Sequence, residues 1–138
     1  MSDNIKNFLA IDYGDSRIGL AIANSIAKLA SPLVTLSNDD QFMSQLTKII
    51  ADNQINEIVI GLPRDMKGNE TEQTKKTRLF TDTIKKHLSL DVYMIDEAGT
   101  SIKAEAELKN RRKSYQKSDI DSLAATYILE DFLNEQKV

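Results

Sequence analysis

The chain has 138 residues, 41% of them hydrophobic and 28% charged, which suits one compact domain, residues 1–138, better than two. Its net charge of −3 and isoelectric point of about 5.2 argue against a protein that coats nucleic acid with its whole surface. With no cysteine and one histidine, His87, it cannot form disulfides or a zinc site of several imidazoles, so any metal must be held mainly by oxygen, which favours Mg²⁺ or Mn²⁺. Because the N-terminus lacks an apolar leader and no run of about 18 apolar residues occurs, we expect a cytoplasmic protein with no membrane partner.

Three short apolar segments open the chain and predict a meander of strands. FLAIDY (8–13) ends at a glycine-containing turn, RIGLAIAN (17–24) follows at once, and PLVTL (32–36) can close the meander. The first two strands must be antiparallel, because a parallel pair needs a crossover of about a dozen residues or more.

Helical and strand patterns alternate from residue 42 onward. FMSQLTKIIADN (42–53) repeats apolar residues at helical spacing, and SNDD (37–40) before it offers N-cap side chains. EIVIGLP (57–63) and LDVYMID (90–96) are typical of buried strands, and the helix predicted between them (70–88) is apolar only toward its C-terminal half. The residues of the first helix expected in the core are Phe42, Leu46, Ile49 and Ile50.

Two more helices are predicted at the C-terminal end. TSIKAEAELKNRR (100–112) is capped by Thr100 or Ser101, and SDIDSLAATYILEDFL (118–133) carries a broad apolar face. The core-facing residues of that last helix are Ile120, Leu123, Ala124, Tyr127, Ile128 and Leu129.

The element order βββαβαβαα predicts an α/β fold: a five-stranded mixed sheet, three antiparallel strands followed by two parallel ones, flanked by helices on both faces. Because crossover connections are right-handed, strands 57–63 and 90–96 should extend the sheet from strand 8–13. The first strand is then central, and its C-terminal end faces a crevice.

Three carboxylates stand where an open α/β sheet places its ligands. Asp12 ends the first strand, Glu97 follows the fifth, and Asp121 lies in the first turn of the last helix. A cluster of carboxylates without a basic partner repels itself and becomes favourable around one or two divalent cations. Two such cations can activate a water and stabilise both oxygens of a phosphodiester displacement. We therefore predict that these three acids bind metal and carry catalysis.

Each acid also has a simpler interpretation. Asp12 can bond the amides of its turn, and Glu97 can be a solvated loop residue. Asp119 and Asp121 can be ordinary acids favoured by the helix dipole. The pattern across the chain is more informative than any one of them.

Several other residues are candidates for contact with a phosphate backbone. Gly14 and Gly19 permit close approach of a phosphate, or simply a tight turn and sheet packing. Arg17 can bind phosphate or pair with Asp15, and the loop 61–68, which contains Arg64, faces the same edge as Glu97. The segment 109–117 has five basic residues and no acidic one, so it can bind the phosphates of a nucleic acid, although the rest of the chain has a net charge of −8. These basic residues are Lys109, Arg111, Arg112, Lys113 and Lys117. His87, near a helix end, is expected at the surface.

Four segments together make the chain resemble the YqgF/RuvX family, which is described as Holliday-junction-resolvase-like and as candidate pre-16S rRNA nucleases. They are IDYGDSRIGLA (11–21), IVIGLPRDMKGNE (58–70), YMIDEAGTSIKAE (93–105) and KSDIDSLAATYIL (117–129). The resemblance implies an RNase H-like fold, in agreement with the predicted element order. It also implies that Asp12, Glu97 and Asp121 are the equivalents of the family's acidic site residues.

The chain departs from the family pattern at a few positions. Ala98 and Gly99 stand where the family usually has an Arg-Leu pair after the Asp-Glu, and this removes a guanidinium that could clamp phosphate or a neighbouring carboxylate. Activity could therefore be weaker or the substrate different. Ser16 replaces a usual basic residue, although Arg17 is kept, and Asp65 replaces a more usual Asn and adds a fourth acid.

These observations favour a metal-dependent nuclease, and the resemblance implies action at the 5′ end of pre-16S rRNA. The alternatives are a Holliday-junction-type DNA endonuclease and a non-catalytic module that binds RNA or protein. An ATP-binding phosphotransferase is disfavoured, because the proteins with the similar Asp-Gly loop close two such domains over the nucleotide. Junction cleavage normally needs two symmetric active sites, and no dimer helix stands out, so we expect RNA rather than branched DNA and a monomer or weak homodimer.

Overall fold

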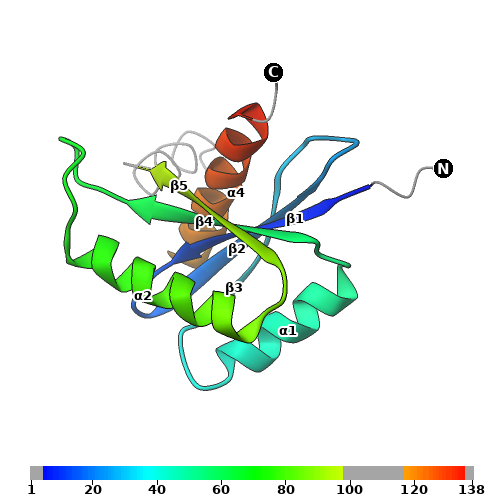
Figure 1. Ribbon diagram of the computed structural model, residues 1–138, viewed down its shortest axis with the longest axis horizontal. Helices are drawn as coiled ribbons and strands as arrows, with labels where there is room; N and C mark the ends of the chain where they lie inside the picture. The colour runs from blue at the N-terminus through cyan, green and yellow to red at the C-terminus, as the bar shows by residue number, and fades with distance from the viewer. Residues whose placement is uncertain (1–4, 98–116, 136–138) are drawn as a thin grey trace.

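The computed structural model describes residues 5–97 and 117–135, which form one sheet with helices on both of its faces (Figure 1). The predicted helix 100–112 lies outside the described residues. The elements are β1 (Asn7–Tyr13), β2 (Arg17–Asn24), β3 (Ser31–Ser37), α1 (Phe42–Asp52), β4 (Glu57–Pro63), α2 (Glu72–His87), β5 (Asp91–Glu97) and α4 (Lys117–Glu135). Each predicted strand is present, with ends that differ by at most one residue from those expected.

The sheet has the predicted topology. Its strand order is β3-β2-β1-β4-β5, with β1, β2 and β3 antiparallel and β4 and β5 parallel to β1. β1 is therefore the central strand, and the carboxyl ends of β1, β4 and β5 lie along one edge. In the β1–β2 register, Asp12 lies directly opposite Gly19.

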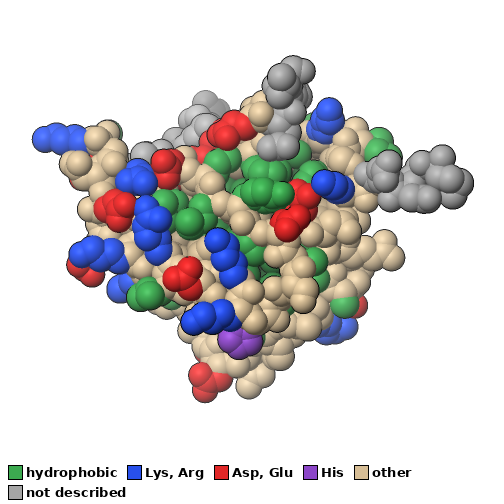
Figure 2. Space-filling model, in the orientation of Figure 1, with side chains coloured by type: hydrophobic (Ala, Val, Ile, Leu, Met, Phe, Trp, Pro, Cys, Tyr) green, Lys and Arg blue, Asp and Glu red, His purple; other side chains and the backbone are tan. Residues whose placement is uncertain are grey.

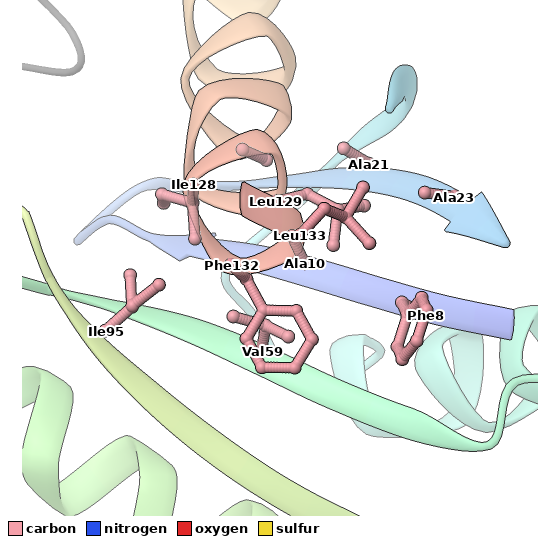
Figure 3. Packing of buried hydrophobic residues seen from close by; sticks show 11 residues of the cluster. Phe8, Ala10, Ala21, Ala23, Val59, Ile95, Ile128, Leu129, Phe132 and Leu133 are labelled. Carbon is pink, nitrogen blue, oxygen red and sulfur yellow. The ribbon is translucent and has the colours of Figure 1, made fainter. Parts of the chain in front are cut away.

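Side chains of β1 alternate between two cores, one on each face of the sheet. Phe8 and Ala10 point toward α4, whereas Leu9 and Ile11 point toward α1 and α2. The α4-side core contains Phe8, Ala10, Ala21, Ala23, Val59, Ile95, Ala125, Ile128, Leu129, Phe132 and Leu133 (Figure 3). The α1/α2-side core contains Leu9, Ile11, Ile18, Leu20, Phe42, Leu46, Ile55, Ile58, Ile60 and Ile84. The alternation places the next residue, Asp12, on the α4 side.

Small side chains on the α4 face let that helix approach the strands closely. Ala10, Ala21 and Ala23 supply this face of β1 and β2, while the opposite face carries Leu and Ile. Phe132 of α4 then packs edge-on against Phe8, with ring centroids 5.6 Å apart. α4 therefore lies directly on the strands whose ends carry the predicted acids.

The ends of α1, α2 and α4 lie within two residues of those predicted, but the cap of α1 differs from expectation. α1 begins at Phe42 with Gln41 at its N-cap, and no side chain caps it, so the expected cap within 37–40 is wrong. The reason is local: the Asp39 carboxylate accepts the Gln41 backbone N–H at 2.9 Å, in a turn that precedes the helix. α2 begins after Thr71, which forms a capping box with Thr74.

On the buried face of α2, threonines take the place of apolar residues from the N-terminal turn to beyond the middle of the helix. Thr74, Thr77 and Thr81 are essentially fully buried. The hydroxyls of Thr77 and Thr81 donate to the carbonyl oxygens four residues earlier, and that of Thr74 donates to the Pro63 carbonyl at the end of β4. Because each buried hydroxyl is paired, α2 packs against the sheet without an unpaired polar group on this face.

In the described ranges, none of the helices combines the length and the hydropathy that a membrane crossing needs.

Candidate active site

Asp12 and Asp121 come together although 108 residues separate them in the chain. Asp12 lies near the end of β1 on the face that α4 covers, and Asp121 lies near the start of α4. Gly19, directly opposite Asp12 on β2, is where the backbone of Asp121 meets the sheet. A Cβ atom at Gly19 would stand 2.1 Å from the Asp121 carbonyl oxygen, so only glycine lets the start of α4 rest on β2 at this point.

The surroundings of Asp12 disfavour the ionised form of its carboxyl group. Burial raises the pKa of Asp12 from its ordinary 3.8 to about 7, and the negative charge of Asp121 adds to this increase. The folded protein thus keeps a carboxyl group that is half ionised near neutral pH, in a position where a cation would stabilise its charged form.

Arg17 is the basic partner of Asp121. Its Nε donates to Asp121 Oδ2 at 2.7 Å, in a partly exposed ion pair between β2 and α4. Asp15, the protein partner that the sequence suggested for Arg17, is therefore not the one observed. Asp15 instead lies 3.3 Å from Lys76 Nζ, at the surface. Arg17 therefore fixes the orientation of Asp121 beside Asp12.

Glu97 ends β5 at the same edge of the sheet, with β4 between it and β1. Ile95, two residues earlier, belongs to the α4-side core, so strand alternation places Glu97 on the same face as Asp12. The Arg64 backbone N–H donates to the Glu97 carbonyl oxygen at 3.1 Å and ties the ends of β4 and β5 together. In 5–97 and 117–135, no three His, Cys, Asp or Glu side chains form one metal-binding group. The structure thus joins two of the predicted acids and places the third on the same edge.

The loop after β4 is held by its own charged residues. Arg64 Nε lies 3.1 Å from Asp96 Oδ1, and its Nη1 lies 3.7 Å from Glu70 Oε2. Asp65 accepts the backbone N–H groups of Lys67 and Asn69, and these hydrogen bonds, with that of Asn69 the largest cause, lower its pKa. The Asp65 carboxylate therefore closes the loop.

Gly14 serves the β1–β2 turn. A Cβ there would lie 2.5 Å from the Arg17 carbonyl oxygen, and the Gly14 carbonyl accepts the Asn38 side-chain amide at 2.9 Å. The tight turn, one of the two roles that the sequence suggested for Gly14, therefore requires a glycine here.

The predicted basic segment lies almost wholly outside the described residues, which include only Lys117, the first residue of α4. Lys109, Arg111, Arg112 and Lys113 all fall in the part that the structure leaves undescribed. His87 is exposed at the C-terminal end of α2, and its Nδ1 lies 2.9 Å from the Thr83 carbonyl oxygen, which confirms its expected place at the surface.

Comparison with known proteins gives a consistent result. A family model described as "RuvX: Holliday junction resolvase" matches residues 6–135. A relative from Sulfurihydrogenibium, named "Putative pre-16S rRNA nuclease", is 36% identical over 132 residues, which is 94% of this chain and 91% of the relative. One of the same name from Rickettsia typhi is 40% identical over 134 residues, 94% of this chain and 85% of the relative.

Solved resolvases share the architecture. T. thermophilus RuvC in complex with a Holliday junction substrate matches with a TM-score of 0.58 and 14% identity, over 95% of each chain. Fowlpox virus resolvase bound to Holliday junction DNA matches with a TM-score of 0.53 and 10% identity, over 96% of this chain and 99% of that one. At these identities the likeness shows the fold alone, and it is the RNase H-like fold that the sequence predicted.

Proposed function

The chain belongs to the RuvX family of Holliday-junction-resolvase-like proteins, and from this premise we propose that it is a divalent-metal-dependent nuclease that acts on precursor 16S ribosomal RNA. One observation supports the metal-dependent chemistry most strongly: the carboxyl at the end of the central strand is buried and lies close enough to Asp121 for the charge of that residue to help raise its pKa to about 7. The names of the relatives, which mention pre-16S rRNA, support the choice of RNA over branched DNA.

The donor atoms at this edge fit a magnesium or manganese ion. Asp12 and Asp121 offer only oxygen, and Mg²⁺ is commonly held by one or two carboxylates together with waters and substrate phosphates. Glu97, on the same edge and face, is proposed as a further ligand. A bound divalent ion would polarise the phosphate and lower the pKa of a water.

The residues around the acids have distinct parts in this proposal. Arg17 holds Asp121 in place through its 2.7 Å hydrogen bond. Gly19 allows α4 to bring Asp121 close to Asp12. The Arg64 backbone, bonded to Glu97, fixes the end of β5. Contacts of Gly14, Arg64 and the basic residues 109–117 with the RNA backbone remain part of the proposal.

Two substrates offered side by side test the proposal. Purified protein is incubated with a precursor 16S rRNA fragment and with a four-way DNA junction, each with Mg²⁺, with Mn²⁺ or with EDTA. We expect cleavage of the RNA only when metal is present, and its loss in Asp12→Asn. Asp52→Asn, which neutralises an exposed carboxylate paired with Lys48 on α1, is the matched control and should cleave normally.

The outcomes separate the candidate functions. Preferred cleavage of the junction would support the resolvase-type alternative. Binding of RNA without cleavage at any metal concentration would support a non-catalytic module. Full activity in Asp12→Asn would refute the assigned site.

A further inference from the structure

A recess of about 360 Å³ lies beside the end of β1, on the α1/α2 side of the sheet. Its floor is aromatic: the rings of Tyr13 and Phe80 stack with centroids 4.3 Å apart, and Phe42 lies 5.8 Å from Phe80. Tyr13 and Phe80 are only half-buried, and Leu79 in its lining is 68% exposed. The recess is therefore an aromatic surface that solvent reaches.

Polar groups complete its lining. An amide, a carboxylate and a hydroxyl are supplied by Asn38, Asp39 and Thr83, so both donors and acceptors are present. Lys76 also lines the recess, and its ion pair with Asp15 is solvent-exposed. Such a surface pair contributes little, so Lys76 can exchange Asp15 for a phosphate at small cost.

The helix that supplies much of the lining, α2, carries a positive charge although the whole protein is negative. α2, which supplies Lys76, Leu79, Phe80 and Thr83, has five Lys or Arg residues against two acids, whereas the chain carries a net charge of −3. Figure 2 shows several Lys and Arg side chains over the region of this helix, with Asp and Glu side chains among them. A positively charged helix beside an aromatic floor is the combination that single-stranded nucleic acids prefer.

The recess lies next to the acidic pair along the chain but on the other side of the sheet. Asp12 and Tyr13 are adjacent residues of β1, and strand alternation turns them to opposite faces. A single-stranded nucleic acid that crosses the carboxyl end of β1 can therefore present its phosphate backbone to Asp12 and a nearby base to Tyr13.

We propose that this recess binds an unpaired nucleobase of a single-stranded nucleic acid, a subsite that rests on the proposed nuclease function. The base stacks on the exposed parts of Tyr13 and Phe80, its edge bonds to the polar lining, and Lys76 contacts the adjoining phosphate. Because duplex bases are stacked and paired, the subsite selects single-stranded substrate.

Binding in EDTA tests this without relying on cleavage. The probes are a labelled single-stranded RNA oligomer and an oligomer of the same length and charge whose bases are absent. Removing a stacked base typically costs roughly tenfold in affinity, so the intact protein should bind the base-containing oligomer at least about tenfold more tightly.

A matched pair of tryptophan variants locates the effect. Thr83→Trp fills the recess from an exposed helical position whose hydroxyl bonds only the Leu79 carbonyl, at 3.1 Å. Thr47→Trp makes the same change at an exposed position of α1 outside the recess, where the hydroxyl bonds the Met43 carbonyl at 2.8 Å. Thr83→Trp should abolish the base preference, and Thr47→Trp should keep it.

The results distinguish this subsite from the proposed function. Equal affinity of the intact protein for the two oligomers would overturn the proposed base-binding subsite, even if RNA is cleaved. That result would favour an apolar side chain of a protein partner as the occupant of the recess. An undiminished base preference in Thr83→Trp would overturn it as well. A base preference abolished only by Thr83→Trp, in a protein that cleaves nothing, would support the subsite and refute the nuclease function.

Discussion

Replacing Asp12 with asparagine should stabilise the folded protein at neutral pH, although it should destroy the proposed activity. In the unfolded chain this carboxyl ionises at its ordinary pKa of 3.8, but in the fold its pKa is raised to about 7. Between these values the unfolded state releases a proton that the folded state keeps, so stability falls as pH rises. Each tenfold change in proton affinity corresponds to about 1.4 kcal/mol. At a pH above the folded pKa, the ionised Asp12 therefore lowers the free energy of unfolding by about 4 kcal/mol.

Urea unfolding of both proteins in EDTA measures this cost. We compare the free energy of unfolding of Asp12→Asn with that of the unmodified protein. The excess stability of the variant should grow by about 3 kcal/mol between about pH 4.5 and about pH 8, because the Asp12 carboxyl is mostly neutral in the folded protein at the lower pH. Taking the difference between the two proteins cancels the pH dependence of other groups. Asp52→Asn, at an exposed surface pair, should change stability by less than about 1 kcal/mol at either pH. An advantage of Asp12→Asn that stays constant or shrinks as pH rises would refute the reasoning.

Three further substitutions have definite expected outcomes. Gly19→Ala should lower the free energy of unfolding by about 2–3 kcal/mol, measured by urea unfolding, because its Cβ would collide with the backbone at Asp121. Arg17→Met should lower the RNA cleavage rate at least about tenfold while circular dichroism stays unchanged, since Asp121 loses the group that orients it; an unchanged rate would contradict this role. Thr71→Ala should lower the melting temperature through a loss of about 1 kcal/mol, because it removes the capping box with Thr74, and cleavage at a temperature where the variant is folded should be unaffected.

The sheet was predictable from the sequence because its signals are local. Strands such as 17–24 and 57–63 are apolar runs that end at turn residues, and chain order with right-handed crossovers fixes how they are arranged. The meeting of Asp12 and Asp121 was also predictable, since one ends the central strand and the other begins a helix that packs on it.

The partners of individual charges were not predictable, because they depend on contacts between residues distant in the chain. Arg17 binds Asp121, 104 positions away, and Asp15 lies beside Lys76, 61 positions away. The role of Gly19 was unpredictable for the same reason. A glycine within a predicted strand indicates that another backbone segment approaches closely, but the sequence does not say which segment. Only the packing of α4 in the structure identifies it as the backbone at Asp121.

The wide separation of the acidic pair along the chain has a consequence for folding. Asp12 lies on β1, whereas Asp121 lies on α4, which follows all five strands in the chain. The same helix completes the α4-side core, so the docking that buries Phe132 and Leu133 also assembles the two carboxylates. A nascent or locally opened chain without α4 therefore lacks half of the acidic pair, and the proposed activity is confined to molecules that have finished folding. Hydrogen exchange can check this link, since the amides of α4 should exchange together, in one opening event that separates Asp121 from Asp12.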